Sequence, residues 1–145
     1  MAEHESPLEG IFAAAANRAG PLDDHVTLAH RLSFYLSQME DPEFRALALE
    51  NSSRAIAGFK RLLEAAIEAG ELIEGPLDTT QMAETIYAME LGSLVSWSVA
   101  AKGSLEAKIR RDLDVLLRPF RKGPRRASAR QVQNPETIST APRPR

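Results

Sequence analysis

The side chains able to carry out chemistry in this chain are few, and most of them stand alone. His25 and His30 are five residues apart, so they do not share one face of a helix well, and His4 lies near the first residue. The chain has no cysteine. Because metal sites need converging ligands and nucleophilic catalysis needs a base beside the nucleophile, we expect no catalytic residue, no metal site and no cofactor.

Glu90 is the most informative charged residue, because it is the single charge in the apolar run of residues 85–101. An ionised carboxylate in apolar surroundings is costly unless it is paired or hydrogen-bonded. Three interpretations follow. Glu90 forms a structural ion pair with Arg54 or Arg110, it recognises a cationic or hydrogen-bond-donating effector, or it reaches the rim of the fold.

The apolar run around Glu90 must itself be covered. A helix with almost no polar side has to be packed on nearly every face, and few other segments of this chain are strongly apolar. A second copy of the chain is the favoured cover, and a monomer that covers the helix internally is the alternative. A membrane span is disfavoured, because the run is short for a bilayer core of about 20 residues and contains Glu90 and three serines.

The elements that position these residues are predicted to be helices. Apolar residues recur at spacings of three and four, and no alternating stretch of strand length stands out. We predict an all-α fold, an antiparallel helical bundle of about five helices. The expected helices run from Leu8 to Arg18, from Asp24 to Met39, from Asp41 to Ala69, from Asp78 to the residue before Gly103, and from Ser104 to Pro119.

Capping residues indicate where the longer helices begin and end. Asp41 can cap the helix that follows it, Pro42 suits the first helical position, and Gly70 suits a left-handed helix end. The last two helices are separated by only a few residues, so we expect them to pack as an antiparallel hairpin.

Two apolar faces are predicted to contribute to the core. The long helix after Asp41 has an apolar stripe that Asn51 and Ser52 interrupt. The helix before it carries apolar residues on one face at helical spacing, and we expect that face to be core. Its members are Leu28, Leu32, Tyr35, Leu36 and Met39.

The last two helices also provide a candidate surface for dimerisation. Small residues in the first of them would let another backbone come close, and the second has an apolar stripe, so the pair could form a four-helix bundle with its symmetry mate. The candidate interface residues are Gly92, Ser93, Ser96, Ile109, Leu113, Leu116 and Phe120.

A ligand pocket would be expected among the second, third and fourth helices, with aromatic walls and a few polar groups. For each aromatic residue, an ordinary place in the core is the alternative. The candidates are Phe34, Tyr35, Met39, Asn51, Phe59, Tyr87, Met89, Glu90 and Trp97.

Charge divides the chain into a body and a tail. Residues 1–120 hold 11 Lys and Arg against 19 Asp and Glu, whereas residues 121–145 hold 7 basic residues and one acidic residue. The tail has four prolines and no apolar periodicity, so we predict that it is disordered. It is either a solvated extension or a nonspecific contact with phosphate or an acidic surface. The contact would use Arg121, Lys122, Arg125, Arg126 and Arg130.

Residues 22–120 resemble the C-terminal regulatory domain of TetR-family (tetracycline-repressor-like) transcriptional regulators. In that family the phrase AGEL closes a long helix, an acidic cap opens the next, a glycine followed by a bulky residue marks its middle, and a Gly-Ser break precedes the last helix. These features match Ala69 to Leu72, Asp78, Gly92 with Trp97, and Gly103-Ser104. The resemblance implies a ligand-binding and dimerisation domain whose last two helices form the dimer bundle. Residues 1–21 would then hold a short helix, a remnant of the helix that links two domains.

The family's DNA-binding module is not found in this sequence. Residues 1–21 are too few for a three-helix module and carry no basic recognition helix. With a net negative body, we expect no sequence-specific DNA binding by this chain alone. The first residues also lack the basic flank and apolar run of a signal peptide, so a cytoplasmic location is expected.

Two functions from different classes therefore remain. One is a small-molecule-sensing and dimerisation domain of a TetR-like regulator, which takes a small apolar or cationic effector. The other is a stand-alone helical interaction module that pairs with itself or with a full-length regulator and binds no ligand.

Overall fold

The described part of the chain is built from helices. The computed structural model describes residues 6–19 and 24–123. The predicted stop at Gly20-Pro21 lies outside the described residues, as does the predicted disordered tail from residue 124 onward, with Arg125, Arg126 and Arg130. The prediction of disorder from residue 121 is wrong for the first three tail residues: they are placed, and Arg121 forms an ion pair with Asp114 at 2.8 Å. The helices are α1 (Pro7–Ala19), α2 (His25–Ser37), α3 (Pro42–Glu68), α4 (Thr79–Ala100) and α5 (Leu105–Leu117), with short 3-10 helices at Gln38–Glu40 and Arg118–Phe120. The prediction of an all-α helical bundle is confirmed.

Side-chain caps begin four of the helices at the predicted residues, with Asp24 capping α2 through the amides of Val26 and Thr27. The Asp41 carboxylate accepts from the Glu43 amide at 2.8 Å, Asp78 accepts from the Thr80 amide at 2.9 Å, and Ser104 Oγ accepts from the Ala107 amide at 3.1 Å. These acceptors satisfy amides that have no partner within the helix. Gly70 follows α3 with φ of 73°, in the left-handed region that glycine adopts without strain.

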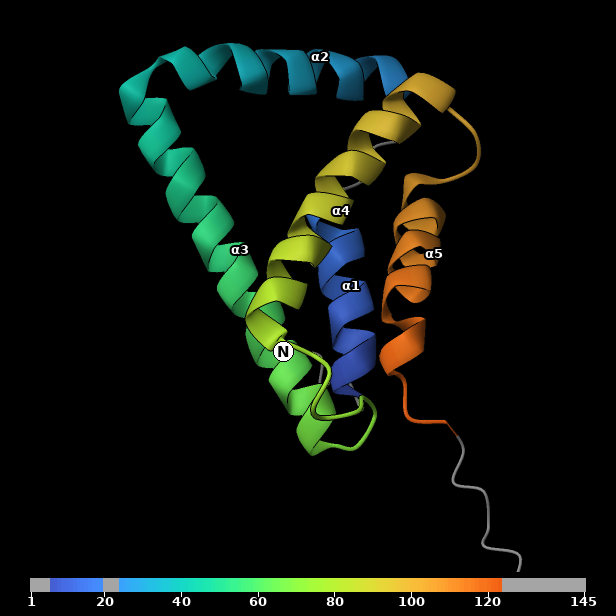
Figure 1. Cartoon of the computed structure of the whole chain (residues 1–145). Coiled ribbons are helices and arrows are strands. Elements are labelled where there is room, and N and C mark those ends of the chain that lie inside the picture. Colours follow the sequence, from blue (N-terminus) through green and yellow to red (C-terminus); the bar gives the residue numbers. More distant parts are fainter. Residues whose placement is uncertain (1–5, 20–23, 124–145) are drawn as a thin grey trace, which may run out of the picture.

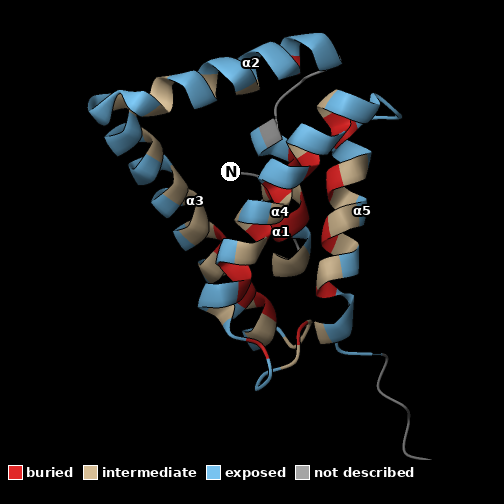
Figure 2. Cartoon of the chain, turned by 45° about the horizontal axis from the view of Figure 1, so that its top comes forward, coloured by how far each residue is buried: buried red, intermediate tan, exposed pale blue. Residues whose placement is uncertain are grey.

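The core lies where α1, α4, α5 and the C-terminal half of α3 meet, and Figure 2 shows the buried residues gathered there. Ile11 and Ala15 of α1 have no exposed surface, because α1 packs against α3, α4 and α5. Short alanine side chains along α1 let these helices approach closely. The first helix is therefore an internal element of the bundle.

Helices α4 and α5 pack together as the predicted hairpin. Ala101 ends α4 with φ of 49°, and the indole Nε1 of Trp97 donates to the Gly103 carbonyl at 3.0 Å across the turn. Every fourth residue of α5 is buried against the bundle. These residues are Leu105, Ile109, Leu113 and Leu117.

Helix α2 reaches the core only through Leu28, with Leu32 partly buried against it, so the prediction that a whole face of α2 is core is wrong beyond these two residues. Figure 1 shows α2, α3 and α4 as the three sides of an open frame, with α2 packing on α4 but not directly against α3. Of the five predicted core residues, only Leu28 is buried, and Leu36 is 64% exposed. An apolar period shows that a helix has a face to cover, but α2 finds only one helix to pack against.

Both ends of the described chain meet at the connection between α3 and α4. The Leu8 amide at the start of α1 donates to the Glu71 carboxylate at 2.8 Å, and the Lys122 amide donates to the Glu71 carbonyl at 3.0 Å. The Ile73 amide donates to the Phe120 carbonyl at 2.8 Å. Glu71 therefore links the start of α1 and the segment after α5 to the α3–α4 connection, at the end of the bundle opposite α2.

Candidate functional site

A buried ion pair joins α1 to the middle of α4. Glu90 is only 2% exposed, and both of its carboxylate oxygens accept from Arg18 Nε, at 3.0 and 3.1 Å. The Arg18 side chain is 39% exposed, so its stem crosses from the core to the surface. Glu90 therefore forms a structural ion pair with an arginine, which is the first of the three interpretations of this residue.

The identity of that partner differs from the prediction. Arg54 instead forms an ion pair with Glu50, and Arg110 with Glu9 and Glu106. The rim interpretation is also wrong, because the Glu90 carboxylate lies in the core. Arg18 was missed because it is 72 residues away in the sequence, where spacing gives no signal.

Desolvation dominates the electrostatics of this pair. Burial raises the pKa of the Glu90 carboxyl, and the charge and hydrogen bond of Arg18 only partly oppose it. Burial also raises the pKa of Tyr87, whose ring lies 5.5 Å from the guanidinium carbon of Arg18. The guanidinium is thus held between a carboxylate and an aromatic face.

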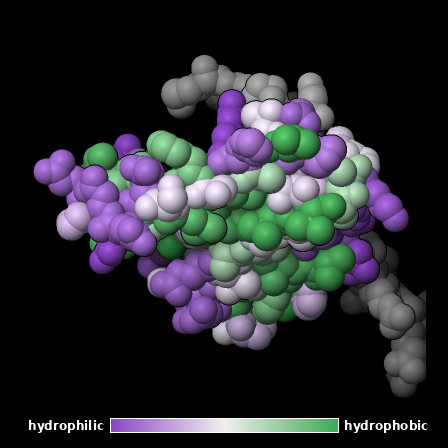
Figure 3. Space-filling view, turned by 90° about the horizontal axis from the view of Figure 1, so that it is seen from above, coloured by the Kyte–Doolittle hydropathy of each residue, from purple (hydrophilic) through white to green (hydrophobic). Residues whose placement is uncertain are grey.

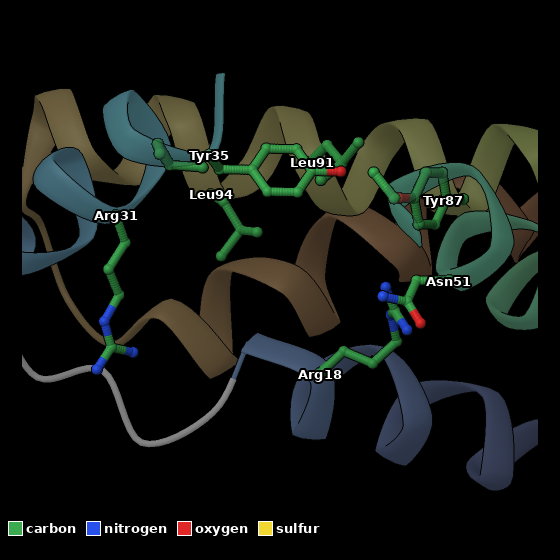
Figure 4. A pocket seen from close by; sticks show the side chains of 9 residues that line it. Arg18, Arg31, Tyr35, Asn51, Tyr87, Leu91 and Leu94 are labelled. Atoms are coloured by element: carbon green, nitrogen blue, oxygen red, sulfur yellow. The ribbon is translucent and has the colours of Figure 1, made fainter. Parts of the chain in front are cut away.

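A cavity of about 310 Å³ lies beside the ion pair, between α2, α3 and α4. Figure 4 shows Arg18 reaching towards Asn51 from α1, with Arg31 extending from α2 elsewhere in the wall. Tyrosine rings and leucines form much of the remaining surface. The residues that line the cavity are Arg18, Arg31, Leu32, Tyr35, Ala48, Asn51, Tyr87, Leu91 and Leu94.

Three predicted pocket residues line this cavity, and Glu90 lies behind its wall. Tyr35, Asn51 and Tyr87 come from α2, α3 and α4, the three helices between which the pocket was expected. Asn51 interrupts the apolar stripe of α3 at the cavity, so the polar break in the sequence marks the site.

The other predicted pocket residues do not line this cavity. Phe59 and Trp97 are buried in the core, and Met89 is half-buried against it. Phe34 is exposed on α2, and Met39 lies in the 3-10 helix that follows. For Phe59 and Trp97, the alternative of an ordinary core position therefore describes the structure.

Six lining residues were not among the sequence candidates. A leucine or alanine on a helix is as typical of a core as of a cavity wall, so its residue type gives no signal for a pocket. The two arginines carried no signal of their own, because a single arginine on a helix is usually solvated. The missed residues are Arg18, Arg31, Leu32, Ala48, Leu91 and Leu94.

A second, smaller cavity of about 190 Å³ lies near the start of α4. Part of its wall is formed by Pro76, Leu77 and Met82, together with Phe120 from the end of the 3-10 helix Arg118–Phe120. Among its described lining residues there is no arginine or lysine and one carboxylate, Asp78, which caps α4. This cavity lies away from the Arg18–Glu90 pair.

The C-terminal half of α4 has an outward face made of apolar and small residues. Val95 is half exposed and Val99 is 82% exposed, although the opposite face of the same helix is buried. Seen from above, Figure 3 shows hydrophobic side chains gathered across the middle of the surface. The outward face consists of Ala88, Leu91, Gly92, Val95, Ser96 and Val99.

None of the described helices is both long enough and apolar enough to cross a bilayer.

The predicted dimer residues divide between this outward face and the core. Gly92 and Ser96 are exposed on it. Ile109 and Leu113 have no exposed surface within one chain, so their assignment to a dimer interface is corrected: they pack against the bundle's own helices.

The three remaining dimer candidates also contact the chain's own core. Ser93 is buried and donates to Asp112 at 2.7 Å. Leu116 and Phe120 are half-buried against the core.

Histidines and carboxylates do not converge in the described part of the chain. His25 and His30 are both exposed on α2. Within residues 6–19 and 24–123, no group of three or more His, Asp or Glu side chains is arranged to hold a metal ion.

Comparisons of the chain with protein-family models, with curated proteins and with solved structures give no match. Function therefore has to be inferred from the chain's own residues and geometry.

Proposed function

We propose that this chain is a small-molecule-sensing and dimerisation domain of a TetR-like transcriptional regulator. The observation that carries the proposal is the cavity of about 310 Å³ whose wall combines two tyrosines, three leucines and a few polar groups from four helices. Small-molecule sites have this composition, in which apolar walls provide affinity and a few polar groups fix orientation. The proposal places the protein in the cytoplasm, where a regulator of transcription acts.

The position of the cavity supports a sensing role. It lies between α2, which is held mainly by α4, and the N-terminal half of α3, which is largely exposed. A ligand that contacts α2, α3 and α4 would favour one arrangement of these helices over others. A ligand shifts the equilibrium between two conformations only if it contacts them differently.

The outward face of α4 supports dimerisation. A Cβ atom added at Gly92 would meet no other atom within 4 Å, so packing within one chain does not require a glycine there. Glycine inside a helix costs about 1 kcal/mol relative to alanine. Close approach by the backbone of a second copy gives this glycine a role, and the neighbouring Val95 and Val99 would be covered by the same contact.

A thermal-shift screen of small lipophilic compounds tests ligand sensing. A ligand that binds only the folded chain raises its melting temperature by mass action. Ala48→Phe, which places a large ring in the cavity, should abolish the shift, whereas Ala57→Phe at an exposed position of the same helix should keep it. Shifts that persist in the Ala48→Phe variant would place the binding elsewhere and refute the proposal for this cavity.

We expect no sequence-specific DNA binding by the residues of this chain alone. The body carries an excess of acidic residues, and α1 is packed inside the bundle, where it cannot read a groove. A mobility-shift assay with the chain's own promoter region should show no salt-resistant specific complex, and such a complex would contradict this expectation.

A helical interaction module that binds no ligand is the second candidate. Exposed apolar side chains on α2 and α3 favour it, because single chains usually cover such residues or use them for contacts. They are Phe34, Leu36, Leu47 and Leu49. The thermal-shift screen separates the two candidates, since the module would give no specific shift.

A further inference from the structure

The described charged groups at the α2–α3–α4 cavity are two arginines in the wall and the one carboxylate of Glu90 behind it, so positive charge is in excess. Arg18 and Arg31 both line the cavity, and no Asp or Glu is among the described lining residues. The Glu90 carboxylate behind the wall is already paired with Arg18, which removes the basis for a cationic effector. Building on the proposed sensing function, we propose that this cavity binds a small lipophilic carboxylate whose acid group meets the guanidinium of Arg18.

Arg18 is held in position for this contact by two neighbours. Its Nε donates to both Glu90 oxygens, and its guanidinium carbon lies 5.5 Å from the centroid of the Tyr87 ring. Among the described residues, no hydrogen bond involves its two terminal Nη atoms. A guanidinium fixed in this way loses little conformational freedom when a carboxylate binds, and its planar fork matches a carboxylate in geometry.

Other groups in the wall suit the same ligand. Arg31, on α2, adds a second positive charge (Figure 4). Asn51 supplies an amide donor. Leu32, Leu91 and Leu94 offer an apolar surface to the rest of the molecule.

The size of the cavity limits the ligand. A volume of about 310 Å³ lies at the lower end of the range of about 300–1,000 Å³ that small-molecule sites cover. Tyr35 and Tyr87 can stack on or edge against a flat ring. An aromatic acid of one or two rings therefore fits better than a long-chain or polycyclic acid.

A charge series on one ring system tests this inference. The probes are 2-naphthoate, neutral 2-naphthalenemethanol and cationic 2-naphthalenemethylamine, each titrated into the full chain by calorimetry at neutral pH. We expect 2-naphthoate to bind at least about tenfold more tightly than the other two, because only its ionised carboxylate can form a bidentate ion pair with an arginine.

Variants assign the preference to the arginines. Arg31→Gln and the paired substitution Arg18→Met with Glu90→Leu should each weaken binding of 2-naphthoate about tenfold and leave the neutral probe within about threefold. The paired substitution is needed because Arg18→Met alone would leave Glu90 buried without its partner. Arg61→Gln, at an exposed arginine of α3 outside the cavity wall, is the matched control and should leave binding of all three probes unchanged.

The outcomes separate this inference from the proposed function. If all three probes bind with equal affinity and Ala48→Phe abolishes their binding, the cavity is a ligand site and the carboxylate preference is wrong. If no probe binds but the thermal-shift screen finds a ligand that Ala48→Phe excludes, the carboxylate inference alone fails. If neither the probes nor the screen gives a cavity ligand, both the inference and the sensing function fail.

Discussion

At the scale of single residues, the buried Glu90 carboxylate depends on Arg18 for its ion pair. Taking a carboxylate out of water costs several kcal/mol, and a partner offsets this only when it is well placed. The sequence could predict that Glu90 needs a partner, because burial cost follows from residue type and surroundings. It could not predict which arginine, because the pair joins the end of α1 to the middle of α4 through tertiary packing.

Substituting only one member of the Arg18–Glu90 pair should lower the free energy of unfolding more than substituting both members together. We expect Arg18→Ala to lower the free energy of unfolding by about 3 kcal/mol, because it leaves a buried carboxylate without its donor. The paired substitution Arg18→Met with Glu90→Leu should return stability to within about 1 kcal/mol of the unsubstituted chain. Urea unfolding followed by circular dichroism measures both, and a double variant as unstable as Arg18→Ala would contradict this account.

Glu90 should also make stability depend on pH in an unusual direction. Because burial raises the pKa of the folded carboxyl, the folded chain keeps a proton that the unfolded chain has already released. The contribution of Glu90 to the free energy of unfolding therefore falls as pH rises from the ordinary glutamate value of about 4.3 through the raised folded value.

The variant Glu90→Gln removes this titration. Across that pH window, the unsubstituted chain should lose stability relative to Glu90→Gln in urea unfolding experiments. Glu84→Gln, at an exposed position of the same helix, is the matched control. A difference between the unsubstituted chain and Glu90→Gln that stays constant with pH would refute the assignment.

At the scale of elements, the α4–α5 hairpin is joined by a polar contact inside its apolar seam. Ser93 donates to Asp112 at 2.7 Å, and Lys108 donates to the same carboxylate oxygen at 2.7 Å. Burial alone would raise the pKa of Asp112, but the hydrogen bonds from Lys108 and Ser93, with the charges of Lys108 and Arg111, outweigh it and lower the pKa. Ser93 therefore contacts an acceptor that stays ionised at neutral pH.

The two serines on α4 provide a matched test of this contact. Ser93→Ala should cost about 1–2 kcal/mol more than Ser96→Ala, because Ser93 is buried and hydrogen-bonded to a charged group while Ser96 is exposed. Any gain in helix propensity is shared by both substitutions and cancels in the comparison. Equal unfolding free energies for the two variants would show that the contact adds no stability.

Helix boundaries could be predicted from the sequence, whereas the placement of α2 could not. Caps and left-handed glycines act locally, so Asp41, Asp78, Ser104 and Gly70 mark helix ends without knowledge of the tertiary fold. The apolar period of α2 reports only that one face is apolar. Whether that face meets a core or lines an open cavity depends on which helices surround it, and that information lies in long-range packing.

At the scale of the whole molecule, the outward face of α4 is the surface through which we propose that two copies of the chain associate. We expect a dimer at micromolar concentration by size-exclusion chromatography with light scattering, because Val95 and Val99 otherwise stay in water. Val95→Glu should give a monomer, since a buried interface does not tolerate an unpaired charge. Leu49→Glu places the same charge on α3 and should leave the dimer intact.

Two results would contradict this arrangement. If the unsubstituted chain is a monomer, the dimer proposal is wrong, and the apolar face of α4 would then belong to a different contact. A dimer that Leu49→Glu breaks and Val95→Glu preserves would move the interface to α3. The sequence predicted that the apolar helix around Glu90 needs packing on nearly every face. It could not show which of these faces packs against other helices of the same chain.

The contacts of Glu71 also bear on how the protein can be handled. Because α1 begins and the last described residues lie at this one end of the bundle, the described segment starts and stops away from the cavity frame at α2 (Figure 1). A biosensor surface or a fluorescent tag attached at an exposed residue of this end, such as Glu74, would leave the frame facing solution. Immobilisation through Glu74 or through Lys122 should therefore give the same ligand response, with the frame accessible in both cases.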